Sequence, residues 1–258
     1  MLTKAILIDQ TFFETLDHRY LIKSLPRGSE SEFFKEELRE PYYNYVRAHP
    51  RSLLVRITDF VHAPTTTLGG LLKLVPNDHV VMENILHGKD SDEQDDKWET
   101  YDLKPANYFY PERDVLNGQL SSDEARDKVV DHFNDKIRIT KQQHDDLKKT
   151  IEEDTAFLRD ANTVDYSFFL IRYPASSSIE AGGTWRSGIK SSDEAWIYRA
   201  VVLDFFWSKH ALPAKAMTVL IKSYNTFDQQ GPMSLTTSST EFKERFVAMV
   251  ESFIETAV

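Results

Sequence analysis

The sequence of 258 residues contains no cysteine, so disulfide bonds, thiolate metal sites and a cysteine nucleophile are all excluded. A chain without disulfides suits a reducing compartment, and we expect the cytoplasm or the nucleus. No apolar run approaches the ~20 residues of a membrane-spanning helix, and the apolar start of the chain is too short for a signal peptide. We therefore expect contact with membranes to be peripheral at most.

Positive charge is also scarce, because 31 lysines and arginines face 41 aspartates and glutamates, for a formal net charge of −10. This balance argues against non-specific binding to nucleic acid and against a constant attraction to acidic lipid surfaces. A hydrophobic content of 41% and a charged content of 28% are ordinary for a globular protein. The length allows one large domain or two small lobes with a core.

Strand patterns dominate the first part of the chain and helix patterns the second. The first part contains one expected helix, Ser31–Ala48, which Pro41 should kink or divide. The acidic run Gly88–Lys97 reads as a solvated loop that connects the two parts. Beyond it, Thr140 and Ser238 are expected to cap two amphipathic helices. The strands expected before the acidic run are Ala5–Phe13, Tyr20–Leu25, Leu53–Val61, Leu71–Val75 and His79–Leu86.

Three charged residues lie in runs that read as buried strands: Asp165 in Thr-Val-Asp-Tyr-Ser-Phe-Phe, Asp204 in Val-Val-Leu-Asp-Phe-Phe, and Lys23 in Tyr-Leu-Ile-Lys-Ser-Leu. A carboxylate removed from water needs a cation or hydrogen-bond donors beside it. A divalent metal would serve both aspartates. A lysine and two separated aspartates are the minimum equipment for holding a metal-bound nucleotide triphosphate and transferring its terminal phosphoryl group. The plainer alternatives are a snorkelling surface lysine and hydrogen-bonded core carboxylates.

The string Tyr101-Asp102-Leu103-Lys104-Pro105-Ala106-Asn107 looks like the catalytic loop of protein kinases. In that interpretation Asp102 is the base and Asn107 a metal ligand. No Asp-Phe-Gly follows at the usual short distance and no Ala-Pro-Glu is present. We therefore treat the protein-kinase interpretation as the weaker one, because short motifs give many false positives.

A longer series of motifs extends from about Phe12 to Ile254. In chain order it comprises Tyr20–Leu25, Phe33–Leu54, Val80–Ile85, Tyr101–Lys104, Asp154–Leu158 with Val164–Phe169, Val202–Asp204 and Phe242–Phe246. These motifs resemble, in the same order, those of the phosphatidylinositol phosphate kinases. The resemblance identifies the chain as a divergent, amino-terminally shortened member of that family.

The resemblance implies an α+β, kinase-like two-lobe fold with antiparallel sheets and helices. Residues 1–88 would form a small strand-rich lobe and residues 89–258 a larger lobe, with the nucleotide cleft between them. Lys23 would hold the α- and β-phosphates of ATP, and Asp204 would ligate Mg²⁺. Asp165 would orient or deprotonate the attacking hydroxyl, and Lys104 would face the substrate or the transferring phosphate.

The same resemblance assigns Met82, Glu83 and Asn84 to the hinge strand that binds the nucleotide. The implied activity is Mg-ATP-dependent phosphoryl transfer to an inositol-containing phosphate, either a phosphoinositide headgroup or a related inositol phosphate. A methionine on a buried strand is also an ordinary core residue, so this part of the assignment is open.

Several departures from the family pattern keep a second function open. Residues Ile8–Glu14 contain no glycine where the family has a Gly-rich loop, and Pro105-Ala106 replaces Gly-Ser. Only scattered basic residues remain after Asp204, among them Lys209 and Lys215, so we expect weak or transient membrane contact. The alternative is a pseudokinase that uses the fold as a binding or regulatory module. The sequence leaves the oligomeric state open.

Overall fold

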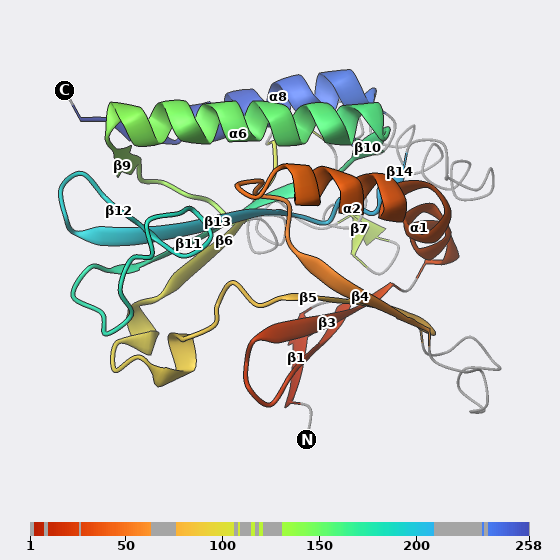
Figure 1. Ribbon diagram of the computed structural model, residues 1–258, viewed down its shortest axis with the longest axis horizontal. Helices are drawn as coiled ribbons and strands as arrows, with labels where there is room; N and C mark the ends of the chain where they lie inside the picture. The colour runs from red at the N-terminus through yellow and green to blue at the C-terminus, as the bar shows by residue number, and fades with distance from the viewer. Residues whose placement is uncertain are drawn as a thin grey trace.

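The structure is a computed structural model. It describes residues 3–7, 10–25, 27–62, 76–105, 108, 115–116, 119–120, 131–208, 234 and 237–257. Figure 1 shows one sheet at one end of the molecule and a second sheet in the middle, with the long helices α6 Lys141–Asp160 and α8 Ser239–Ser252 on the far side of the second sheet. The amino terminus lies at the first sheet, and the carboxyl terminus lies at the opposite end beside α6 and α8.

The first sheet is antiparallel and has five strands in the order β1-β2-β3-β5-β4. Its strands are β1 Thr3–Leu7, β2 Gln10–Glu14, β3 Tyr20–Leu25, β4 Ile57–His62 and β5 Asp78–Glu83. The single strand expected over Ala5–Phe13 is wrong, because β1 and β2 form a hairpin with Leu7 opposite Gln10. The polar pair Asp9-Gln10 interrupts the apolar run and is the sequence signal for that reversal. The expected strand Leu71–Val75 lies outside the described residues.

The expected helix after β3 begins earlier than predicted and has three parts. These are α1 Gly28–Phe33, the π-helical η1 Phe34–Leu38 and α2 Arg39–Ala48. In η1 the Arg39 N–H donates to the Phe34 carbonyl, five residues back. Pro41 has no N–H to offer the Glu37 carbonyl, so the regular helical pattern is lost at this point. The predicted division of the helix is confirmed just before Pro41.

The segment after α2 connects the two sheets. Leu53, Leu54 and Val55 are buried, and Leu54 forms a parallel bridge with Val202 in the second sheet. The Val202 N–H donates to the Leu53 carbonyl at 2.7 Å, and the Val55 N–H donates to the Val202 carbonyl at 3.0 Å. The strand expected over Leu53–Val61 therefore serves both sheets, and only its second half, as β4, joins the first.

The second sheet is antiparallel and has four strands in the order β12-β13-β11-β6. Its strands are β6 Glu99–Leu103, β11 Ser167–Pro174, β12 Ile189–Lys190 and β13 Trp196–Leu203. Most residues of β11 and β13 are buried, which agrees with their largely apolar sequences. Three short pairs complete the description: β9 Ile137–Ile139 with β15 Ile254–Thr256, β10 Thr163–Val164 with β14 Trp207–Ser208, and β7 Val115–Leu116 with β8 Gln119–Leu120.

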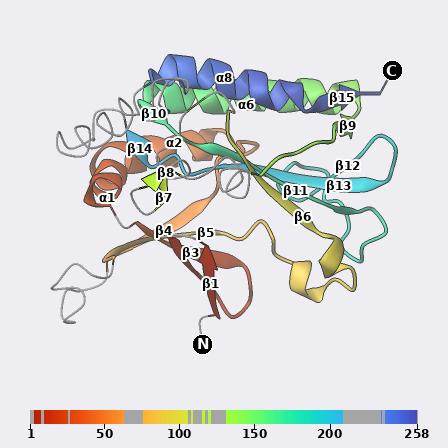
Figure 2. The same ribbon diagram turned by 180° about the vertical axis from the view of Figure 1, so that it is seen from behind.

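The two long helices, α6 Lys141–Asp160 and α8 Ser239–Ser252, pack side by side (Figures 1 and 2). The predicted caps are confirmed. Thr140 and Gln143 form a complete capping box, and the Ser238 hydroxyl accepts from the Glu241 N–H at 3.1 Å. The apolar faces of both helices are buried, so their amphipathic pattern is satisfied. Among the described helices, none is long and apolar enough to span a bilayer.

The acidic run expected as a solvated loop contains two 3-10 turns, η2 Lys89–Ser91 and η3 Asp95–Lys97. Most of its side chains face solvent, but Asp92 is buried. The Asp92 carboxylate accepts from the Trp98 indole N–H at 2.8 Å and from the Ser177 hydroxyl. One member of the charge run is therefore an anchor that ties the run to the turn after β11. The division of the chain into lobes at residue 88 stays a prediction.

Candidate active site

Lys23 sits near the middle of β3, between Phe12 of β2 and Val80 of β5 in the sheet register. Lys23 is only 3% exposed, so the alternative of a snorkelling surface lysine does not apply. The ammonium lies 5.6 Å from the centre of the Phe12 ring and 5.7 Å from that of Phe206. It forms an ion pair with the carboxylate of Asp204, 181 residues further along the chain.

The fold brings Asp165 and Asp204 to the same end of the two inner strands of the second sheet, β11 and β13. Asp165 lies between β10 and β11, and Asp204 lies between β13 and β14. Ser167 pairs with Leu203 on one side of the two aspartates, and Val164 pairs with Trp207 on the other. Two consecutive pairings thus fix both residues, although they are far apart in sequence.

Both aspartates adopt a backbone conformation that is uncommon outside glycine, with φ of 68° at Asp165 and 63° at Asp204. The sequence analysis placed both inside strands, and that expectation is wrong. Each occupies a left-handed turn at a strand end, which aspartate tolerates better than most residues. Non-glycine residues in this region cluster at functional sites, because the surrounding structure must hold them there.

Lys104 follows directly after β6 and reaches Asp165. Its Nζ donates to the Asp165 backbone carbonyl at 2.8 Å and lies 3.6 Å from the carboxylate Oδ2. The pairing of Leu103 with Phe168 sets this distance, because it holds the end of β6 against the start of β11. The side chain of Asp165 is 14% exposed, so its carboxylate is largely removed from water beside a cation.

These four side chains line one pocket together with Arg27, Glu30, Phe206 and Trp207. Arg27 pairs with Glu30 at 2.7 Å, and its guanidinium lies 5.0 Å from the centre of the Trp207 ring. The sequence analysis missed these four lining residues. A signal was present, because Arg27 follows Lys23 by four residues and the aromatic run Phe205-Phe206-Trp207 directly follows Asp204.

The electrostatics of the pocket favour an ionised Asp204. Burial alone would raise the pKa of this carboxyl, but the charges of Lys23 and Lys104, with the hydrogen bond from Lys23, outweigh burial and lower the pKa below 3.8. The sequence analysis expected a metal to compensate both aspartates, whereas here each one lies beside a lysine. Two carboxylates in one pocket remain a ligand set that Mg²⁺ accepts, because Mg²⁺ prefers oxygen donors and completes its shell with water or phosphate oxygens.

The three predicted hinge residues are placed elsewhere. Met82 is buried in β5 between Leu21 and Ile57. The Glu83 carboxylate pairs with Arg186 and accepts from the Arg56 N–H at 2.8 Å. The Asn84 amide donates to Glu14 at 2.6 Å. The described lining of the Lys23 pocket includes none of these three side chains, and their role in nucleotide binding stays a prediction.

Two other expectations concern residues around this site. Asp102, the base in the protein-kinase interpretation, lies on β6 opposite Phe169, and its N–H donates to Asp131 at 2.6 Å. Asn107 lies outside the described residues, as do Lys209 and Lys215 of the scattered basic stretch. The described lining of the pocket includes Lys23, Lys104 and the two aspartates, and it does not include Asp102.

Comparison with known families decides between the two kinase interpretations. A family model described as Phosphatidylinositol-4-phosphate 5-Kinase matches residues 8–180, well over half of the chain. The chain belongs to this family. The family and the α+β fold expected from the sequence are confirmed, and the general character is that of a phosphoinositide kinase domain. The match includes Lys23, Lys104 and Asp165, and the fold adds Asp204 from beyond it. No curated protein matches the chain.

Proposed function

We propose that the domain transfers the terminal phosphoryl group of ATP, with Mg²⁺, to a hydroxyl of an inositol-containing phosphate. The observation that carries this proposal is the convergence of two lysine–aspartate pairs, Lys23 with Asp204 and Lys104 with Asp165, in one pocket. Catalysis of phosphoryl transfer consists mainly of positioning and charge stabilisation, so two cations and two carboxylates around one space supply what the reaction needs.

Lys23 and Asp204 form the nucleotide side of the proposed site. Asp204 and the phosphates would hold Mg²⁺, which when bound offsets the negative charge that the phosphates carry. Lys23 would then exchange its carboxylate partner for phosphate oxygens. Because its ammonium is enclosed by Phe12 and Phe206, its position is fixed before the nucleotide arrives. A fixed cation needs little reorganisation when negative charge shifts during transfer.

Asp165 and Lys104 form the acceptor side. The attacking hydroxyl would give its proton to the Asp165 carboxylate as its oxygen bonds to phosphorus and the bond to ADP breaks. Lys104 holds the Asp165 carbonyl at 2.8 Å and so orients the base. With its neighbour Arg27 it would also attract an anionic headgroup, since both cations line the pocket.

The alternative is a pseudokinase that binds nucleotide or headgroup without turnover. One observation favours it: β1, β2 and β3 contain no glycine, and bulky residues such as Phe12 lie beside Lys23 on the strand that would cover the phosphates. Close approach of backbone amides to phosphate usually relies on glycine. In this alternative the same pocket binds its ligands but lacks the cover that aligns them for transfer.

The test measures transfer of label from γ-labelled ATP to a panel of inositol phosphates and phosphoinositides, together with nucleotide binding by thermal shift. Labelled product from at least one panel member is expected, with Mg-ATP raising the melting temperature. A nucleotide-dependent shift without product would favour the pseudokinase. Absence of both product and thermal shift would contradict the nucleotide site itself.

A further inference from the structure

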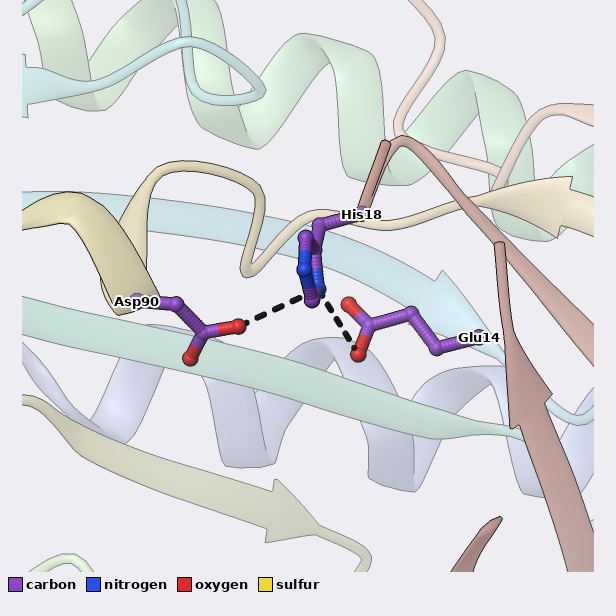
Figure 3. A group of neighbouring side chains, drawn as sticks. All are labelled: Glu14, His18 and Asp90. Carbon is purple, nitrogen blue, oxygen red and sulfur yellow. Dashed lines mark ion pairs between the residues drawn. The ribbon is translucent and has the colours of Figure 1, made fainter. Parts of the chain in front are cut away.

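A second group of ionisable side chains lies away from the Lys23 pocket, where the turn between β2 and β3 meets the segment after β5. It comprises Glu14 at the end of β2, His18 in the turn and Asp90 in η2. Figure 3 shows the carboxylates of Glu14 and Asp90 pointing at the His18 ring from two sides. Three separate elements therefore contribute one side chain each.

The two carboxylates converge on the same nitrogen. His18 Nδ1 lies 3.1 Å from Glu14 Oε2 and 3.2 Å from Asp90 Oδ2. A single ring nitrogen carries at most one proton, so it cannot serve two carboxylates well. Nδ1 is shielded from solvent and, among the described residues, makes no hydrogen bond of acceptable geometry to either of them. The arrangement therefore leaves a buried polar atom and two anionic oxygens without a shared partner.

Other histidines with acidic neighbours lack this convergence. His62 Nδ1 contacts a single carboxylate, that of Asp78, at 2.8 Å. His144 uses a different nitrogen for each neighbour, Nδ1 for Asp145 and Nε2 for Glu251. Convergence of two carboxylates on one nitrogen thus distinguishes the His18 cluster within the described part of the chain.

The spacing of the three ligand atoms suits a small divalent ion. A tetrahedral ion with bonds of about 2.0 Å holds its ligand atoms about 3.3 Å apart. The observed separations of 3.1 and 3.2 Å are close to that value, and all three atoms lie within 4.8 Å of one another. One imidazole nitrogen and two carboxylate oxygens suit Zn²⁺ and its neighbours in the transition series better than Mg²⁺, which prefers an all-oxygen shell.

Asn84 forms hydrogen bonds with two of the three residues, Glu14 and His18. Its amide group donates to Glu14 Oε1 at 2.6 Å and to the His18 carbonyl at 2.9 Å, and its Oδ1 accepts from the Leu86 N–H at 3.0 Å. Partners that orient metal ligands in this way contribute strongly to affinity in known sites. The Glu14 oxygen that Asn84 contacts is not the one that faces His18, so the second oxygen stays directed at the cluster.

We propose that Glu14, His18 and Asp90 form a three-ligand site for a transition-metal dication, best suited to Zn²⁺, with water completing the shell. The bound ion would fasten the β2–β3 turn to η2 and so fix this end of the inner strands of the first sheet relative to the segment that follows β5. The site is separate from the Lys23 pocket and does not depend on the proposed kinase activity.

The test titrates chelator-treated protein with Zn²⁺ by calorimetry and with Co²⁺ by visible absorption. The variant is His18→Asn, because asparagine tolerates the φ of 56° at this position while its shorter side chain cannot reach the carboxylates. The matched control is His62→Asn, which removes a histidine with one acidic partner. Circular dichroism checks that both variants fold.

Wild type and His62→Asn are expected to bind one Zn²⁺ with the same affinity and to raise the melting temperature on binding. His18→Asn should bind at least about 10-fold more weakly and lose the Co²⁺ absorption. Asp90→Asn, on a largely exposed side chain, should weaken binding in the same direction. Equal affinity in wild type and His18→Asn, or no binding by wild type below about 100 μM, would overturn the proposal.

Discussion

The pairing of Lys23 with Asp204 predicts that the two residues are coupled in stability before any ligand binds. We consider Lys23→Met, Asp204→Asn and the double variant, measured without metal or nucleotide. Lys23 is 3% exposed and faces two aromatic rings, so removing its carboxylate partner leaves a buried ammonium without compensation. A carboxylate without this partner would make Asp204→Asn neutral or stabilising, whereas the ion pair with Lys23 makes the variant destabilising.

The magnitude follows from the exposure of each partner. Breaking a fully buried ion pair costs about 3–5 kcal/mol. The side chain of Asp204 is 29% exposed, so solvent screens the pair, and we expect Asp204→Asn to cost less than a fully buried pair would, about 2 kcal/mol. Lys23→Met should cost about 1 kcal/mol, because Asp204 keeps some water and the charge of Lys104. The double variant should lose about 1 kcal/mol less than the two single losses together.

The assay is urea denaturation followed by the fluorescence of the four tryptophans, in buffer with a chelator. Unchanged slopes across the four proteins would allow the free energies of unfolding to be compared. Additive losses, within about 0.5 kcal/mol, would refute the direct pairing of the two side chains. An Asp204→Asn variant as stable as wild type would refute it as well.

Three further predictions concern separate features. Because the pKa of Asp204 is lowered in the folded state, the unfolded state takes up this proton first as pH falls, so the stability from the carboxylate is present above its usual pKa of 3.8 and is lost as pH falls through the lower folded value. The difference in unfolding free energy between wild type and Asp204→Asn, measured by denaturation curves, should be constant above about pH 5 and shrink below about pH 4. A difference that grows in acid would contradict this sign. Lys104→Met should lower turnover by about 100-fold with little change in the KM for ATP, because Lys104 orients Asp165. The control is Lys149→Met, on an exposed side chain of α6. An equal loss of turnover in the two variants would show a non-specific effect. Thr140→Ala should lower the free energy of unfolding by about 1 kcal/mol because it removes the capping box of α6, whereas Thr150→Ala within the same helix should lower it by less. Equal melting temperatures for wild type and Thr140→Ala would show that the cap is dispensable.

Local signals in the sequence predicted the parts of the fold that depend on neighbouring residues. The capping residues Thr140 and Ser238 located the two long helices, because a cap and an amphipathic face are set within a few turns. The apolar runs around Asp165 and Asp204 located the central strands of the second sheet. The family motifs added the order of these elements along the chain.

Contacts between distant residues could not be predicted from such signals. The contact of Lys23 with Asp204 depends on how two sheets meet, which periodicity does not specify. Leu54 has an apolar strand pattern, yet its bridge is with Val202 in the other sheet. Asp92 looks like one more member of an exposed acidic run, and only the fold shows the Trp98 indole against it. Arg27 lies only four residues after Lys23, but its contact with Trp207 in the pocket depends on the fold.

The most direct test of the proposed function is single-turnover transfer from γ-labelled ATP to the best acceptor of the inositol panel, compared between wild type, Asp165→Asn and Asp160→Asn. Asp160 is an exposed carboxylate at the end of α6 and serves as the control. Asp165→Asn should transfer at least about 100-fold more slowly while Mg-ATP still raises its melting temperature, because the proton acceptor is lost and the nucleotide side is intact. Asp160→Asn should match wild type. Equal transfer rates in wild type and Asp165→Asn would contradict the assignment of Asp165 as the base and, with it, the proposed use of this pocket.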